Sequence, residues 1–187
     1  MPLSIDDWNG HLALHDVEEK PKKPLKVSFG NVCIEKLGQV LTPKQVNKMP
    51  CIQWDGMNRN ALHTFVATDP DVPSREDPSM GEWHHCIVVN MKGNDFESGK
   101  TLTKFVGSAP GKDTGLHRYT LLVYEQSGPL TCDEPILGDK SAEHREKFKA
   151  KKFRHKYKLG PPVAGMCYQA EWDESVPALY EQMGVKQ

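Results

Sequence analysis

The feature that most constrains this chain is a polar, proline-rich stretch set between two apolar runs. Residues 69–85 read DPDVPSREDPSMGEWHH, and the runs at 62–68 and 86–91 are rich in β-branched and apolar side chains. Because each proline fixes its own φ and pushes the residue before it toward extended conformations, the stretch cannot be helical. It must cross the end of a sheet as extended pieces and turns. Such a rigid polar loop is either a binding site or an ordinary surface loop, and its composition leaves both interpretations open.

Chain length limits the number of domains, and net charge limits the classes of partner. A chain of 187 residues is long enough for one sizeable core and short for two, so we expect a single domain over residues 1–187. The 24 basic residues nearly balance the 25 acidic ones. No global charge therefore favours nucleic acid, and we expect no nucleic-acid partner.

The amino terminus and the cysteines indicate the compartment. The chain begins MPLSIDDW, which lacks the basic start and apolar stretch of a secretory signal, and no apolar run reaches membrane-spanning length. The five cysteines are odd in number and scattered. This pattern fits reduced thiols better than a disulfide framework or a zinc site, so we expect a cytoplasmic protein without metal or cofactor.

Turn signals dominate residues 25–135 and separate several strand-like runs. The clearest strands cover residues 62–68, 86–91 and 119–124. Further strand-like pieces are expected at residues 25–29, 52–55 and 163–172, and a short apolar piece at 102–106 lies within a stretch of turn residues. The pattern favours a mainly β domain with an antiparallel core and helices added at the end.

Helix signals are fewer and mostly late in the chain. Ser4 to Trp8 could form a helical turn, and Thr42 to Gln45 has a capping residue, a proline and a glutamine in the order of a helix start. Ser141 could cap a helix that runs through Phe153, with lysines on its exposed side. A final helix is expected over residues 176–183.

Several titratable residues fall where neighbouring strands end or begin. Asp69 ends one strand, His117 and Tyr119 open another, and the pair His84–His85 enters a third. Successive side chains of a strand point to opposite faces, so at most one histidine of the pair can enter a given pocket. That alternation argues against a metal site on the pair. A single histidine on a strand usually has a structural role. The clustering of titratable residues makes a binding site about equally well supported.

Catalytic motifs are weak. The glycine-rich segment 107–115 has three residues where a phosphate-binding Walker loop needs four, and Asp113 stands where that loop needs serine or threonine. No nucleophile elbow of the Gly-x-Ser-x-Gly type is present, which argues against a hydrolase. Because nothing in the candidate site supplies a nucleophile, we expect a protein that is not an enzyme. The basic run 144–158 could meet anionic lipid or a phosphorylated partner, although such a run is more often a solvated helix face.

Six irregular motifs spread over nearly the whole chain give a family resemblance. They are TDPDVPSR at 68–75, EWHH at 82–85, VVNMKGND at 88–95, GLHRY at 115–119, CDEPIL at 132–137, and VAG at 163–165 with YQAEW at 168–172. With these motifs the chain resembles the phosphatidylethanolamine-binding protein family, in particular its animal cytosolic branch, which includes Raf kinase inhibitor-like proteins. The resemblance implies a Greek-key fold of antiparallel sheets, with a C-terminal helix beside a small anion pocket.

The resemblance also implies a site and partners. Asp69, His85 and His117 would hold a phosphate or a phosphoryl headgroup, and four further residues would complete the site: Trp83, Pro110, Tyr119 and Tyr180. The implied ligands are phosphatidylethanolamine or another phosphoryl anion, including nucleotides. The implied partners are Raf-type or other kinases and a membrane surface. The alternative is a serine-protease inhibitor that acts through a surface loop.

Three departures from the animal branch bear on these expectations. Met80 and Gly81 stand where that branch usually has tyrosine and arginine, so the pocket rim would differ. Ala109 and Gly111 replace the commoner glycine and proline around Pro110. Finally, Lys152 occupies the position of the serine that kinase-inhibiting relatives use as a phosphorylation switch, so this chain cannot use that switch.

Overall fold

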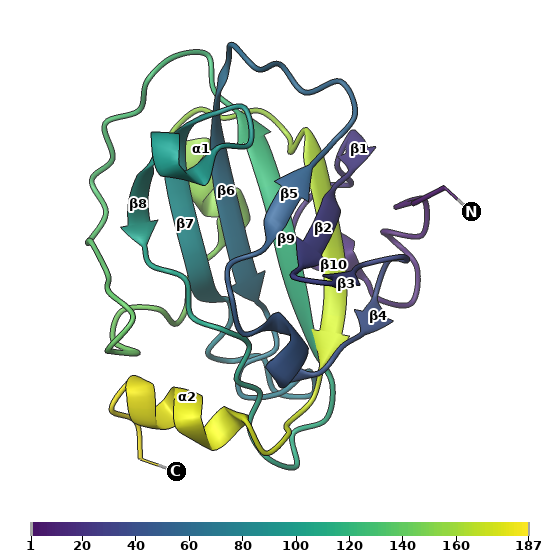
Figure 1. Cartoon of the computed structure of the whole chain (residues 1–187), viewed down its shortest axis with the longest axis vertical. Helices are drawn as coiled ribbons and strands as arrows, with labels where there is room; N and C mark the ends of the chain where they lie inside the picture. Colours follow the sequence, from purple (N-terminus) through teal and green to yellow (C-terminus); the bar gives the residue numbers. More distant parts are fainter. Residues whose placement is uncertain (1, 187) are drawn as a thin grey trace.

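The computed structural model describes residues 2–186 and is organised around one large sheet (Figure 1). The strands of this sheet, in spatial order, are β1 (Lys23–Pro24), β10 (Ala164–Ala170), β9 (His117–Glu125), β6 (Leu62–Asp69), β7 (Trp83–Lys92) and β8 (Lys100–Thr103), with β4 (Gln39–Val40) also paired to β10. A smaller sheet consists of β3 (Val32–Cys33), β2 (Lys26–Phe29) and β5 (Cys51–Gln53).

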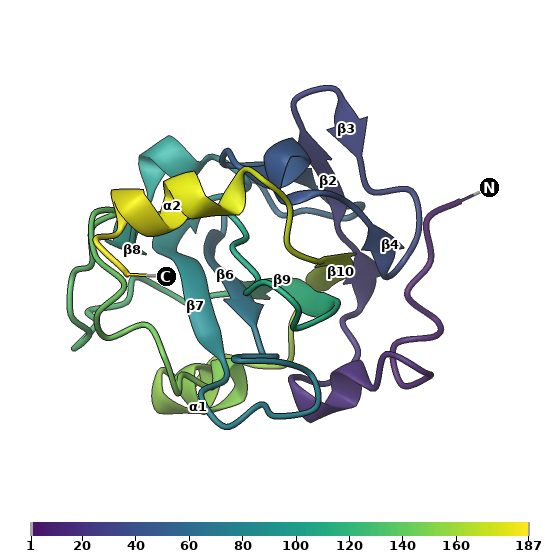
Figure 2. The ribbon, with the colours of Figure 1, turned by 90° about the horizontal axis from the view of Figure 1, so that it is seen from below.

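The helical elements are short. They are α1 (Ala150–Lys156), α2 (Val176–Gln182) and three 3-10 turns: η1 (Leu14–Asp16), η2 (Pro43–Val46) and η3 (Phe96–Ser98). Seen from below, the small sheet covers one face of the large sheet, whereas α1 and the N-terminal turn lie on the opposite face (Figure 2). Helix α2 crosses the end of the sheet. Within residues 2–186, no helix has both the length and the apolar character needed to cross a membrane.

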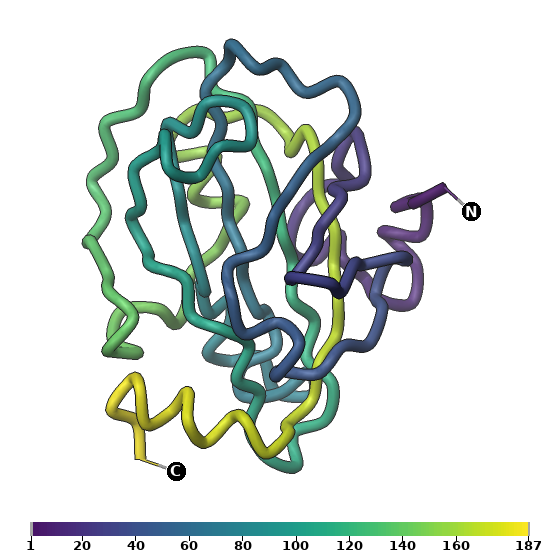
Figure 3. The backbone as a smooth tube through the Cα atoms, in the orientation of Figure 1, coloured from purple at the N-terminus to yellow at the C-terminus, as the bar shows by residue number. Residues whose placement is uncertain are grey.

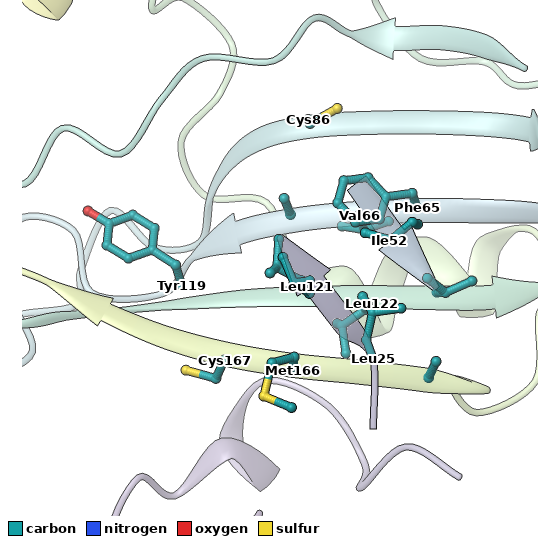
Figure 4. Close-up of a cluster of buried hydrophobic side chains, with 14 of the residues drawn as sticks. Leu25, Ile52, Phe65, Val66, Cys86, Tyr119, Leu121, Leu122, Met166 and Cys167 are labelled. Carbon is teal, nitrogen blue, oxygen red and sulfur yellow. The ribbon is translucent and has the colours of Figure 1, made fainter. Parts of the chain in front are cut away.

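Coverage on both faces explains why the central strands are almost continuously buried. All residues of β9 except the last are buried, and β6 is buried beyond its first residue. Phe29 of the small sheet packs edge-on against Tyr168 of β10, with ring centroids 5.6 Å apart. Figure 4 shows apolar side chains gathered along these strands, with the Tyr119 hydroxyl turned away from them toward one end of the sheet. The core therefore ends where polar groups begin.

Most of the expected strands are confirmed, with shifted ends. Strands β6 and β9 cover the runs expected at 62–68 and 119–124, and β10 lies within the run expected at 163–172. Strand β7 begins earlier than expected, so both histidines of the pair lie inside it rather than in the preceding loop. The expected final helix is confirmed as α2. The capping signal at Thr42 is also confirmed, because Thr42 and Gln45 bond each other's backbone N–H at 3.2 and 2.9 Å, although only a 3-10 turn follows.

The expected helix from Ser141 to Phe153 is wrong in its first half, since α1 begins only at Ala150. The reason is long-range pairing: the backbone N–H of Phe148 donates to the Glu82 carbonyl at 2.9 Å, and the N–H of Glu82 donates to the Phe148 carbonyl at 2.8 Å. This exchange of bonds extends the edge of the sheet and holds the chain extended. Tertiary hydrogen bonds thus override a local helix signal.

Two smaller expectations also need correction. The helical turn expected at residues 4–8 forms no regular helix: residues 6–9 make a hydrogen-bonded turn, and the Trp8 N–H donates to the Ile5 carbonyl at 3.0 Å. Trp8 is buried, and its Nε1 donates to the Glu18 carbonyl at 2.9 Å. The sheet is not purely antiparallel, because β1 and β4 both run parallel to β10. Strand β1 pairs with the start of β10 and β4 with its end, and residues 25–38, which contain strands β2 and β3 of the small sheet, connect the two. The backbone tube traces this connection (Figure 3).

Candidate functional site

Three neighbouring strands bring polar residues to one end of the large sheet. Strand β6 ends at Asp69, while its antiparallel neighbours β7 and β9 begin at Trp83 and His117. Antiparallel pairing places the end of one strand beside the start of the next. These residues therefore meet at the end of the sheet that α2 crosses (Figures 1 and 2). They line a pocket of about 270 Å³.

The pocket combines a polar floor with apolar walls. The polar side chains that line it are Asp69, His85, Thr114, His117 and Tyr180. The other residues that line it are Val72, Pro73, Trp83, Ala109, Gly111, Ala142, Met183 and Val185. A mostly apolar concavity with a few convergent polar groups is typical of a small-ligand site.

A β-bulge places His85 in the pocket. Ala67 of β6 pairs with Cys86 and Thr68 pairs with His84, so His85 is the extra residue between the two pairs. His84 then points to the other face, where its Nε2 donates to the His144 carbonyl at 3.0 Å and its Nδ1 accepts from the Thr103 hydroxyl at 3.0 Å. Only His85 lines the pocket, as the alternation of strand side chains requires.

A chain of hydrogen bonds forms the pocket floor. His117 Nδ1 lies 2.7 Å from Asp69 Oδ2, and the other Asp69 oxygen accepts from the Asp71 N–H at 2.7 Å. Thr114 Oγ1 donates to the Gly111 carbonyl at 2.7 Å, so it can only accept from His117 Nε2, also 2.7 Å away. His117 Nε2 is therefore protonated. Burial raises the pKa of Asp69, while its contact with His117 lowers it.

The hydrogen bond that His85 makes fixes its tautomer. Its Nδ1 lies 2.8 Å from the Val106 carbonyl, which can only accept, so Nδ1 carries the proton. Burial lowers the pKa of His85 to about 3, and the charge of Arg145 adds to this effect. At neutral pH the ring is uncharged, and its Nε2 is an acceptor without a proton.

Arg145 places an uncompensated positive charge behind the pocket. Its guanidinium donates to four backbone carbonyls, those of His84, His85, Lys104 and Gly138, at 2.7–3.3 Å. It also lies 5.0 Å from the centre of the Trp83 ring. No carboxylate in residues 2–186 forms an ion pair with it. Burial lowers the pKa of Arg145 to about 10, so it remains charged at pH 7.

Aromatic rings support the floor from below. Tyr119 stacks on Tyr168 at 5.1 Å and meets the edge of the His85 ring at 5.5 Å. Trp83 lies on the other side of His85, with ring centroids 4.5 Å apart. The Tyr119 hydroxyl is buried without a hydrogen-bond partner among the described residues, and burial raises its pKa well above the ordinary value. The two histidines are thus held by packing as well as by hydrogen bonds.

Helix α2 closes one side of the pocket and is tied down at two points. The Tyr180 hydroxyl donates to the Ala109 carbonyl at 2.9 Å, and Gln182 Nε2 donates to the Asp139 carbonyl at 2.9 Å. The residues after the helix, Met183 and Val185, complete the wall. The lining therefore depends on segments far apart in sequence.

The structure brings most of the sequence-predicted residues together. Asp69, Trp83, His85, His117 and Tyr180 line the pocket. Tyr119 lies beneath the floor and contacts both histidines through its ring. Pro110 is buried between two residues that line the pocket and does not line it itself.

Sequence reasoning missed Thr114, Arg145 and the C-terminal residues Met183 and Val185. Thr114 lies three positions before His117, and this spacing was the only local signal for it. Arg145 belongs to the basic run and has no signal that separates it from the exposed lysines. The described residues contain no group of three or more histidine, cysteine or carboxylate side chains placed to hold a metal ion.

Comparison with known proteins gives a family match over most of the chain. The family described as phosphatidylethanolamine-binding protein matches residues 20–160. A protein of Drosophila melanogaster named putative odorant-binding protein A5 is 34% identical over 167 residues, which covers 89% of this chain and 79% of that protein.

Solved structures share the fold. The solution structure of the protein CG7054 is 36% identical with a TM-score of 0.71, covering 87% of this chain and 92% of that one. A carboxypeptidase Y inhibitor, solved in complex with its cognate proteinase, has a TM-score of 0.74 at 23% identity, covering 90% and 95% of the two chains. A phosphatidylethanolamine-binding protein from Plasmodium vivax has a TM-score of 0.67 at 21% identity, covering 82% and 87%. At these identities the last two show the fold alone.

Proposed function

Because the chain belongs to the phosphatidylethanolamine-binding protein family, we propose that it is a non-enzymatic binding protein whose pocket holds a phosphoryl group. The observation that carries the proposal is the hydrogen-bonded pair of Asp69 and His117, 2.7 Å apart on the pocket floor beside His85. Arg145 adds positive charge behind the Trp83 wall. A buried cation and a protonated imidazole nitrogen favour an anion in a pocket with low effective dielectric.

The walls support an amphiphilic ligand such as a phospholipid headgroup. The apolar rim formed by Val72, Met183 and Val185 would contact the part of the ligand that carries the phosphoryl group. The two hydroxyls that line the pocket, those of Thr114 and Tyr180, both donate to backbone carbonyls. Neither is activated as a nucleophile, which supports binding rather than catalysis.

Docking to a kinase belongs to the same proposal and comes from the family membership. The exposed Lys152 lies on α1, where kinase-inhibiting relatives carry a phosphorylatable serine. Occupancy of the pocket, rather than phosphorylation at this position, would then regulate docking in this chain.

Replacement of His117 by glutamine is expected to weaken the binding of phosphoethanolamine at least about tenfold, since one hydrogen bond to a charged group contributes about 1.5–3 kcal/mol. The measurement is a titration at pH 6 followed by NMR through the imidazole signals of His85 and His117. In the wild type both signals should shift saturably. His15→Gln, which changes an exposed histidine, is the matched control and should bind like the wild type. Absence of a saturable shift in the wild type would overturn the proposed function.

A second candidate, inhibition of a serine protease, is favoured by the segment around Ile136. The Ile136 side chain is 63% exposed, and the segment is anchored on both sides of it. The backbone of Leu137 bonds to Leu102 and Lys104 at 2.8 Å, and the side chain of Glu134 pairs with Lys156. A projecting apolar residue on a pinned, extended backbone is the form in which a protease accepts a substrate-like loop.

Ile136→Asp is expected to weaken inhibition of chymotrypsin-like or elastase-like proteases about tenfold or more, because one apolar side chain in a specificity pocket contributes about 1–3 kcal/mol. Inhibition constants provide the measurement. Val40→Asp changes another exposed apolar residue and serves as the matched control. The pocket variant His117→Gln should inhibit as well as the wild type. If the wild type inhibits none of these proteases, this candidate is excluded.

A further inference from the structure

The pocket floor presents one hydrogen-bond donor and one acceptor, and this pairing restricts the ligand further. This inference rests on the proposed function. We propose that the pocket selects phosphate monoesters over diesters, because a monoester can donate a hydrogen bond from its P–OH group to His85 Nε2. One phosphate oxygen accepts from His117 while a second, protonated oxygen donates to His85. Each step follows from the contacts of the two rings.

His117 supplies the donor. Its Nε2 hydrogen points to Thr114 Oγ1 at 2.7 Å, and that hydroxyl already has the Gly111 carbonyl as its own acceptor. A ligand oxygen can replace Thr114 as the acceptor and leave the Thr114–Gly111 bond intact. Because Asp69 holds Nδ1 of the same ring at 2.7 Å, the ring keeps its orientation when the ligand enters.

His85 supplies the acceptor. The Val106 carbonyl holds its Nδ1 proton at 2.8 Å, and no hydrogen bond to its Nε2 is present among residues 2–186. The lone pair of Nε2 is therefore open to the pocket that His85 lines. The ring itself is held between Trp83 and Tyr119, with ring centroids 4.5 and 5.5 Å away, so Nε2 keeps its direction toward the pocket.

The surrounding charges keep His85 as an acceptor. The titratable groups that face it from other elements are Asp69 on β6, His117 and Tyr119 on β9, Tyr180 on α2, and Arg145 in the segment before α1. Arg145 donates to the carbonyl of His85 itself at 3.3 Å and opposes a further positive charge. Asp69 directs its charge to His117 and to the Asp71 N–H, so it does not compensate a charge on His85.

The consequence is discrimination by the protonation state and the substitution of the phosphate. A monoester monoanion has both a P–O⁻ group for His117 and a P–OH group for His85. A dianion lacks the hydrogen and faces the Nε2 lone pair, and a diester lacks it at every pH above its first ionisation. The second pKa of a phosphate monoester is about 6. The monoanion fraction therefore falls from about one half at pH 6 to about one hundredth at pH 8, roughly 50-fold.

The test compares a monoester with the diester that carries the same ammonium group. Dissociation constants of phosphoethanolamine and glycerophosphoethanolamine are measured by calorimetry at pH 6 and pH 8. We expect phosphoethanolamine to bind roughly 50-fold more weakly at pH 8. The diester should bind at least about tenfold more weakly than the monoester at pH 6, with little change at pH 8. Short-chain lysophosphatidic acid separates the two sources of a monoester: tighter binding than phosphoethanolamine indicates a lipid, and equal binding indicates a free metabolite.

His85→Gln tests the role of the acceptor directly. Its amide can turn either N–H or C=O toward the ligand, so it should bind both ionic forms and flatten the change with pH to less than about threefold. His15→Gln should keep the full change. Equal binding of the monoester at pH 6 and pH 8, or equal binding of monoester and diester at pH 6, would overturn the inference while leaving the proposed function intact. Absence of binding by every ligand at both pH values would overturn both.

Discussion

Replacement of Asp71 by asparagine is expected to lower the free energy of unfolding by about 3–5 kcal/mol, the usual cost of removing one partner of a buried ion pair. The Asp71 side chain is fully buried and accepts from Arg118 through Nε at 2.9 Å, Nη2 at 2.7 Å and the backbone N–H at 2.8 Å. Asparagine has the same size but no charge. The variant would leave the Arg118 guanidinium buried without its counter-ion.

The double variant Asp71→Leu with Arg118→Met separates lost charge balance from lost packing. Because two apolar side chains leave no buried charge, it should be more stable than Asp71→Asn. It would not recover fully, since Arg118 also donates to the Leu12 carbonyl at 2.7 Å and so holds the N-terminal segment. Chemical denaturation supplies the free energies. Asp55→Asn, in the exposed Lys26–Asp55 pair, is the control and should change little. A stability of Asp71→Asn equal to that of the wild type would contradict the prediction.

The Asp71–Arg118 pair also shows what the sequence could not provide. Asp71 was part of the polar loop that pointed to a site, and Arg118 lies between two residues assigned to that site. Their side chains instead face the opposite direction, toward residues 12–13. The pairing depends on contacts between segments more than 40 positions apart in sequence, for which local patterns carry no signal.

Strand periodicity was enough to locate the candidate site but not its detailed geometry. Alternation along the strand correctly implied that His84 and His85 face opposite sides, and chain order placed Asp69 and His117 at neighbouring strand ends. The bulge that makes His85 the extra residue arises from how β7 pairs with Ala67 and Thr68 of β6, and no sequence pattern predicts it. The same limit applies to α1, whose start is set by the pairing of Phe148 with Glu82.

Basic residues were the hardest to assign. In the run 144–158 every lysine and arginine looks like part of a solvated helix face. The structure makes Arg145 fully buried and binds it to four carbonyls, because three separate segments direct carbonyl groups at the same point. A buried polar group needs hydrogen-bond partners. Here the partners are backbone carbonyls, which every residue has, so the sequence carries no signal for them.

Glu82→Gln is expected to stabilise the protein at pH 8 by about 3 kcal/mol more than it does at pH 4.5, because it removes a carboxyl that folding forces to hold its proton. Glu82 is 3% exposed and lies on the side of the sheet that α1 covers, where it accepts from the Thr68 hydroxyl at 2.9 Å and the Ala150 N–H at 3.2 Å. Burial outweighs these bonds and raises its pKa from 4.5 to about 7.

The direction of the effect follows from the difference in bound protons. Between pH 4.5 and about 7 the folded state keeps the Glu82 proton that the unfolded state has lost, so the stability of the wild type falls as the pH rises. The loss is complete above about pH 7, and a difference of about 2.5 pKa units corresponds to about 3 kcal/mol. Urea denaturation of both proteins from pH 4.5 to 8 isolates the contribution of Glu82, since the titration of other groups cancels in the difference. Glu97→Gln, at an exposed glutamate, should give a difference that does not vary with pH. A similarly flat difference for Glu82→Gln would mean that the carboxyl is ionised when buried, with Thr68 and the start of α1 stabilising its charge.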